Sequence, residues 1–219
     1  MMKSLLRSWL KKTPFFYPLV NWRSRRRQRT ELGAWEAAGR PLPPPHLVKQ
    51  RVLRAYAQRY HLRILVETGT FRGDMVEAMK RTFANIYSIE LQSAFHAEAT
   101  ERFRDEPQVH LIQGDSAVEL GVLVDQIQEP ALFWLDGHYS AGNTARGQKD
   151  TPIMEELAHL LRDQHTRHVI IIDDARCFGA DAAYPTLEAL REYVLARNPA
   201  LEVEVRDDSI RITPTAVDG

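Results

Sequence analysis

Segments with the patterns of strands and helices alternate strictly from Ile64 to Arg197. The strand-like segments are short apolar runs, and the helix-like segments repeat their apolar residues every three or four positions. This alternation predicts an α/β fold in which helices wind doubly around a mostly parallel sheet. The expected strands are Ile64–Glu67, Ile86–Glu90, Val109–Gln113, Ala131–Leu135 and Val169–Ile172, and the expected helices are Met75–Thr82, Ala94–Phe103, Ala117–Ile127, Pro152–Arg162 and Tyr184–Arg197.

The C-terminal end of the chain departs from this alternation. Leu201–Val205 and Ile210–Thr213 are strand-like and are joined by Asp207-Asp208-Ser209, which predicts a hairpin. The sheet should therefore have seven strands, and the last of them should run against its neighbours.

Charge is distributed unevenly along the 219 residues. Residues 1–30 hold nine Lys or Arg and no acid, which leaves 20 basic against 29 acidic residues in the remainder, a net charge of −9. An acidic body repels phosphate, so we expect no nucleic-acid partner. The proline-rich segment Pro41–Pro45 is a stiff linker. We therefore expect a basic arm with its linker at 1–45 and one domain at 46–219, which opens with an amphipathic helix, His46–Tyr60.

The basic arm has two interpretations. Residues 3–12 have the pattern of a short amphipathic helix, and an arginine-rich run, Arg23–Arg29, follows. Residues 1–29 could bind an anionic membrane surface, where each basic residue contributes about 1 kcal/mol. The alternative is a solvated, partly disordered arm.

Cysteine content and hydropathy indicate where the protein resides. The single cysteine, Cys177, excludes an internal disulfide and suits a reducing compartment. No apolar run is long enough to cross a membrane, and no secretory signal is apparent. We expect a cytoplasmic protein, or one held peripherally at the inner membrane surface. The sequence leaves open whether the chain forms a homo-oligomer.

The run from Leu65 to Asp74 predicts a ligand-binding turn between a strand and a helix. Glu67 ends the apolar strand, and Gly69 and Gly73 follow four residues apart. Because glycine has no side chain, a ligand can approach the backbone closely at these positions. The run has neither the lysine of a phosphate-binding loop nor the three glycines of nicotinamide-binding proteins. A carboxylate before the first glycine suits a cationic or amine-bearing ligand, although such turns are often only structural.

Acids end five successive predicted strands, namely Glu67, Glu90, Asp115, Asp136 and the pair Asp173-Asp174. In an open α/β sheet these ends form the ligand-binding edge. Glu90 follows Gly69 by 21 residues, the spacing at which a carboxylate accepts hydrogen bonds from both hydroxyls of a ribose. An adenosine-type ligand is therefore expected. The competing explanation is helix capping, for which Asp115-Ser116 is the clearest candidate.

With these motifs the sequence resembles the class I methyltransferases that use S-adenosylmethionine (SAM), from about Ile64 to Thr213. The variant Glu67-Thr-Gly-Thr resembles the branch of macrocin-type, metal-dependent sugar O-methyltransferases. The resemblance implies a Rossmann-like methyltransferase fold and methyl transfer to a hydroxyl of a small molecule or saccharide. The cofactor-binding residues that it implies are Glu67, Thr68, Gly69, Thr70, Phe71, Gly73, Asp74, Glu90, Leu91, Asp115, Ser116 and Asp136.

The resemblance also implies a metal site and a catalytic base. Asp136, Asp173 and Asp174 come from neighbouring strand ends, and Mg²⁺ prefers such oxygen ligands. The other interpretation is that Asp173 caps the next turn and that Asp174 is solvated. His138 lies two residues after Asp136 and is the expected general base, with Asp136 as its catalytic partner.

Two further functions compete with methyl transfer. The body could be a non-catalytic module that binds an adenosine cofactor and is held at a membrane by its basic arm. A nicotinamide-dependent oxidoreductase is disfavoured by the missing third glycine and by the reversed final strand.

Overall fold

The structure is a computed structural model that describes residues 16–136, 151–163 and 167–215. The chain divides into two compact units, residues 1–49 and residues 50–219. The second unit holds the sheet, and with it every predicted site residue of the sequence analysis.

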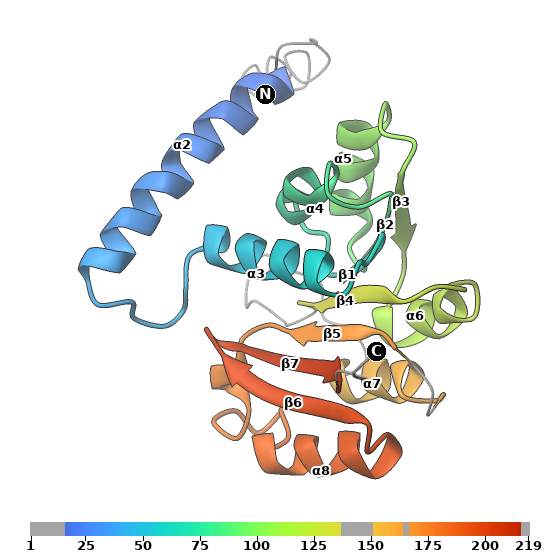
Figure 1. The fold of residues 1–219 in the computed structure, drawn as a ribbon. Coiled ribbons are helices and arrows are strands. Elements are labelled where there is room, and N and C mark those ends of the chain that lie inside the picture. The colour runs from blue at the N-terminus through green and yellow to red at the C-terminus, as the bar shows by residue number, and fades with distance from the viewer. Residues whose placement is uncertain (1–15, 137–150, 164–166, 216–219) are drawn as a thin grey trace. The chain divides into compact units, whose positions relative to one another are not determined.

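The second unit is built on a seven-stranded sheet with the order β3-β2-β1-β4-β5-β7-β6 (Figure 1). Strands β1 to β5 pair in parallel, whereas β7 is antiparallel to both β5 and β6. The predicted α/β fold with a reversed last strand is thus confirmed. The strands are β1 (Ile64–Thr68), β2 (Asn85–Glu90), β3 (Val109–Gln113), β4 (Ala131–Leu135), β5 (Val169–Ile172), β6 (Leu201–Arg206) and β7 (Ser209–Pro214).

Helices cover both faces of the sheet, and a separate apolar cluster lies under each set. One face carries α3 (His46–Arg59) from Gln50 onward, α4 (Asp74–Met79) and α5 (Ser93–Phe103). The other face carries α6 (Ser116–Val124), α7 (Ile153–Leu160) and α8 (Leu187–Arg197). Alternate residues of each central strand pack in the two clusters, so that Val66 lies on the α6 side and Leu65 on the α4 side.

The central strands are continuous apolar runs because both of their faces are covered. All residues of β1, β4 and β5 are buried. The strand order reverses between β1 and β4, since β2 and β3 extend from one side of β1 while β5 extends from the far side of β4. A ligand crevice is expected outside the carboxyl ends at such a reversal.

Several element bounds differ from those expected, and two of the differences have a clear cause. Strand β1 runs one residue further, to Thr68, which pairs with Ile89 and Leu135. Helix α8 begins at Leu187, later than the predicted Tyr184, because Pro185 disfavours helical backbone in the residue before it. Thr186 then caps the helix through a hydrogen bond from the Ala189 N–H to Oγ1, at 3.1 Å. A short 3₁₀ helix at Ala175–Cys177, η1, was not predicted.

In the first unit, the arginine-rich run forms part of a 22-residue helix, α2 (Phe16–Ala37). Pro18 lies in its first turn, where a missing N–H breaks no helical hydrogen bond, so this proline does not end the helix. The predicted helix at 3–12 lies outside the described residues. Among the helices of the described segments, none combines the length and apolar character needed to span a bilayer.

Candidate functional site

The turn between β1 and α4 is fixed to strand β2. The amides of Gly69 and Thr70 donate to the Ile89 carbonyl oxygen, at 3.0 and 3.2 Å. Gly73 has a φ of 72°, and a Cβ atom there would come within 2.5 Å of the Phe103 ring. Only glycine satisfies both conditions. The second glycine of the motif is thus required by the fold, whatever the turn binds.

Glu67 is buried at the end of β1, on the α4 side of the sheet. Its side chain is 2% exposed, and Oε2 accepts a hydrogen bond from the Ser88 hydroxyl at 2.6 Å. The Ser88 and Thr70 hydroxyls are themselves 2.6 Å apart. Burial raises the pKa of Glu67 to about 8, and the negative charge of Asp136 adds to the shift. A cationic ligand group beside Glu67 would favour the ionised carboxylate.

Glu90 is anchored by the backbone around it. It is 6% exposed; Oε2 accepts from the Phe71 N–H at 2.7 Å and Oε1 from the Gln92 N–H at 2.8 Å. Each carboxylate oxygen can accept a second hydrogen bond. The carboxylate is therefore held in place and can still receive two hydroxyl groups.

An aromatic pair lies beside Glu90. The Phe71 ring meets the Phe95 ring edge to face, with centroids 4.6 Å apart. Phe71 is partly exposed and has a φ of 48°, in the left-handed region. Phe95 was not predicted as a site residue, because the sequence does not reveal that this residue of α5 lies beside Phe71.

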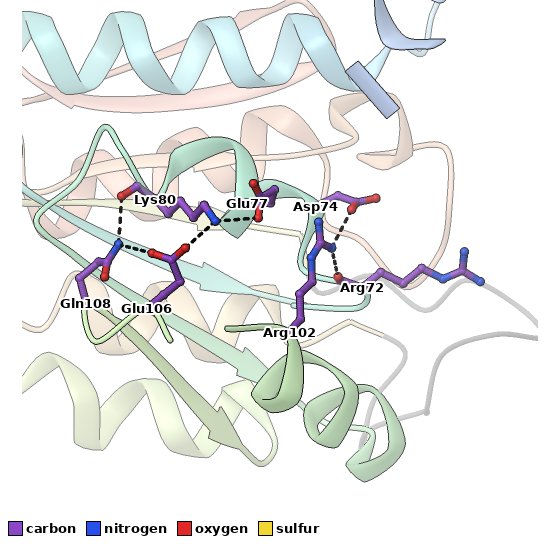
Figure 2. A network of polar contacts seen from close by, with 7 residues as sticks. All are labelled: Arg72, Asp74, Glu77, Lys80, Arg102, Glu106 and Gln108. Atoms are coloured by element: carbon purple, nitrogen blue, oxygen red, sulfur yellow. Dashed lines mark hydrogen bonds and ion pairs between the residues drawn. The ribbon is translucent and has the colours of Figure 1, made fainter. Parts of the chain in front are cut away.

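Asp74, predicted to contact the cofactor, takes part in a polar network on the outer side of the turn (Figure 2). Arg102 of α5 donates from Nη1 to the Arg72 carbonyl oxygen and to Asp74 Oδ1, the latter at 2.9 Å. Lys80 pairs with Glu77 and with Glu106, at 3.0 and 2.6 Å. The hydrogen bond from Lys80 lowers the pKa of Glu106. The network ties α4 and the end of the turn to α5.

Asp115 caps helix α6. Its Oδ1 accepts a hydrogen bond from the Ala117 N–H at 3.0 Å. This is the capping role that the sequence analysis weighed against cofactor binding. A contact of Asp115 or Ser116 with a ligand remains a prediction.

Three aspartates converge where β4 and β5 end. Asp136, Asp173 and Asp174 each offer a carboxylate oxygen, and these atoms all lie within 4.8 Å of one another. Their positions follow from the strand pairing, since the Asp136 N–H donates to the Thr68 carbonyl oxygen and the Asp173 N–H to that of Leu135, at 3.2 and 3.0 Å. Three hard oxygen ligands in one place suit a divalent cation such as Mg²⁺.

Asp174 also has a partner within the protein. Arg176 Nη1 lies 2.7 Å from Asp174 Oδ1 and also contacts Asp208, which is buried. This arginine offsets part of the charge of the cluster. As a metal ligand, Asp174 would therefore have to share its charge with Arg176.

Glu156 of α7 is a buried acid of this region that the sequence analysis missed. It is 1% exposed, and its Oε1 has no hydrogen-bond partner among the described residues. Burial raises the pKa of Glu156 to about 7, and the nearby hydroxyls of Ser116 and Thr68 oppose that shift. The signal was present: Ile153, Glu156, Leu157 and Leu160 share one helical face, so the acid lies on the apolar side of α7.

His138, the predicted catalytic base, lies outside the described residues. The remaining predicted site residues are described. Glu90, Glu67, Asp136 and the Asp173-Asp174 pair lie at the carboxyl ends of the adjacent strands β2, β1, β4 and β5, respectively.

Solved structures share this fold. TomG, an O-methyltransferase from Streptomyces achromogenes solved in complex with SAM, is 18% identical with a TM-score of 0.55, and the match covers 86% of this chain and 89% of TomG. A putative O-methyltransferase from Klebsiella pneumoniae is 17% identical with a TM-score of 0.54, over 86% and 90% of the two chains. An O-methyltransferase from Bacillus cereus, solved with SAH, is 15% identical with a TM-score of 0.53, over 85% and 90%. No family model matches the sequence, and no curated protein matches it. The chain therefore has the Rossmann-like methyltransferase fold.

Proposed function

We propose that the protein transfers a methyl group from SAM to a hydroxyl of a small molecule or saccharide, with the help of a divalent metal. The observation behind the proposal is the placement of Glu67, Glu90 and Asp136 at the ends of three adjacent strands. They lie where the strand order reverses, on a fold that is shared with O-methyltransferases solved with SAM or SAH.

The two glutamates match the two polar ends of SAM. Glu90 accepts hydrogen bonds from both ribose hydroxyls with the lone pairs that the backbone leaves available. Glu67 faces the cationic amino group of the methionine part, whose charge compensates the cost of burying a carboxylate. The exposed ring of Phe71 offers an apolar surface beside Glu90.

The aspartates would act on the hydroxyl that accepts the methyl group. Asp136 and Asp173, with Asp174, would hold Mg²⁺, and a bound divalent cation lowers the pKa of a hydroxyl that it coordinates. Asp136 orients the acceptor, and His138 takes the hydroxyl proton as general base. The motifs Asp136-Gly137-His138 and Asp173-Asp174 support an analogy with the sugar-methylating, macrocin-type branch.

Methyl transfer from isotope-labelled SAM to a panel of hydroxyl acceptors, including saccharides, tests the proposal. We expect label in an acceptor with Mg²⁺ present, loss of transfer after EDTA treatment, and recovery when Mg²⁺ is restored. Activity that is indifferent to EDTA would remove the metal from the proposal. Binding of SAM without transfer to any acceptor would favour the non-catalytic module.

A further inference from the structure

A small cavity lies beside the aspartate cluster and extends toward α7. Its volume is about 20 Å³, and its polar lining comes from Asp136, Thr151, Glu156, Asp173 and Tyr184. A single water molecule needs roughly 10–15 Å³ of such space. The cavity therefore has room for one water molecule and is too small for an acceptor molecule.

Glu156 is the side chain at this cavity whose hydrogen bonding is incomplete. Its Oε1 is buried and has no hydrogen-bond partner among the described residues, and α7 holds the side chain against the core. A buried carboxyl oxygen without a donor is unfavourable, because it has lost its contact with water and gained no hydrogen bond in exchange. A water molecule in the cavity would supply the missing donor.

The remaining lining constrains what that water can bind. Three of the five polar side chains are carboxyls, which accept hydrogen bonds when ionised. A water molecule that donates both protons to such groups directs its lone pairs elsewhere. A cation held by the neighbouring aspartates is a suitable partner for those lone pairs, because Mg²⁺ retains several waters when proteins bind it.

We propose that Glu156 accepts a hydrogen bond from a water molecule in this cavity, and that this water connects Glu156 to the divalent cation held by Asp136 and Asp173. The cation itself belongs to the proposed function. Glu156 does not join the three aspartates whose oxygens lie within 4.8 Å of one another, so it acts through the water and is no direct ligand. It is a positioning residue of the metal site.

Removal of such a supporting group typically weakens metal affinity 10–100-fold. The test is a titration of the full chain with Mn²⁺, followed by electron paramagnetic resonance. We compare the wild type with Glu156→Leu, Glu156→Gln and Asp173→Asn, and use Glu155→Gln as the matched control on the same helix. Calorimetric SAM affinity and the melting temperature of each variant report whether the fold is kept.

We expect Glu156→Leu to weaken Mn²⁺ binding 10–100-fold and Glu156→Gln to weaken it several-fold, since the amide keeps one acceptor but loses the charge. Asp173→Asn should abolish binding, and Glu155→Gln should leave it unchanged. SAM affinity should stay at the wild-type level in both Glu156 variants. If Glu156→Leu does not fold, the Mn²⁺ affinity of the isosteric variant Glu156→Gln tests the role of Glu156.

Two results would overturn the inference, and they differ in what else they imply. Wild-type Mn²⁺ affinity in both Glu156 variants, together with its loss in Asp173→Asn, would refute the role of Glu156 and leave the metal site intact. Absence of Mn²⁺ binding to the wild type would refute the metal part of the proposed function as well.

Discussion

Glu67 is a buried carboxyl whose ionisation makes the stability of the fold depend on pH. Its pKa is raised to about 8 by burial, so the folded, ligand-free protein holds this group mostly protonated at neutral pH, whereas the unfolded chain ionises it near pH 4.5. The contribution of Glu67 to the free energy of unfolding is fully present below pH 4.5 and is lost as the pH rises through 8. A cationic ligand group beside Glu67 would instead favour the ionised form of this carboxyl in the folded protein.

The Glu67→Gln variant should therefore be more stable than the wild type at pH 7 in the absence of ligand, by about 3 kcal/mol. The amide keeps the size of the side chain and is neutral in both the folded and the unfolded states. Urea denaturation at several pH values measures the effect, and the gap between the two proteins should widen from pH 5 to pH 8. The same variant should bind SAM more weakly. A gap that stays constant with pH would show that Glu67 ionises alike in both states.

The sequence predicted that Glu67, Glu90 and the three aspartates lie at the carboxyl ends of strands, and they do; that they bind a ligand stays a prediction. It could not choose between capping and binding for Asp115, because both roles use the same carboxyl at the same position. It missed Glu156 because Glu155 and Glu156 are adjacent acids in the first turn of α7 and look alike in sequence. Only the apolar residues at three- and four-residue spacing placed Glu156 on the buried face.

The turn between β1 and α4 depends on helix α5 as well as on its own sequence. Arg102 of α5 binds the Arg72 carbonyl oxygen and the Asp74 carboxylate (Figure 2), and so fixes the end of the turn that carries Phe71. This contact could not be predicted from the sequence, because the two segments are separated by 28 residues or more.

Arg102→Met should lower SAM affinity several-fold and leave the fold intact. The methionine keeps most of the packing of the arginine stem but loses the hydrogen bonds to the turn, so the Phe71 and Glu90 contacts become less well ordered. Calorimetric titration with SAM measures the loss. Lys80→Met is the matched control in the same network: it removes the ion pairs to Glu77 and Glu106, and should reduce stability without changing SAM affinity. Equal effects of both substitutions on affinity would contradict a specific role for Arg102.

At the element scale, strands were predicted more accurately than helices. Three strands, Val109–Gln113, Ala131–Leu135 and Val169–Ile172, have the predicted bounds, because buried parallel strands are apolar runs with clear ends. Helix α2 was not predicted as one element, since its arginine-rich sequence has no apolar stripe. Helix α8 starts later than predicted because Pro185 delays it.

The whole molecule combines a basic arm with an acidic body. The arm carries nine of the 29 basic residues within its first 30 positions, and residues 31–219 have a net charge of −9. We propose that residues 1–29 attach the protein to an anionic membrane surface, where basic residues contribute about 1 kcal/mol each.

Deletion of residues 1–29 should reduce sedimentation with vesicles that contain phosphatidylserine and leave SAM affinity unchanged. The wild type should bind these vesicles at low salt and less at high salt, because screening weakens the attraction. Vesicles of neutral phosphatidylcholine are the control. Equal binding of wild type and truncated protein to the anionic vesicles would show that the arm has no such role.

If the carboxyl edge of this sheet is a SAM site, SAM affinity should depend strongly on Glu90. A calorimetric titration of SAM into the wild type should show saturable binding, and Glu90→Ala should weaken it at least about a hundredfold. The reason is that two charge-assisted hydrogen bonds to the ribose, worth about 1.5–3 kcal/mol each, are lost. The exposed residue Glu188 of α8 supplies the control, and Glu188→Ala should bind as the wild type does. Absence of SAM binding to the wild type, or equal affinity in Glu90→Ala, would show that this edge of the sheet is not the SAM site.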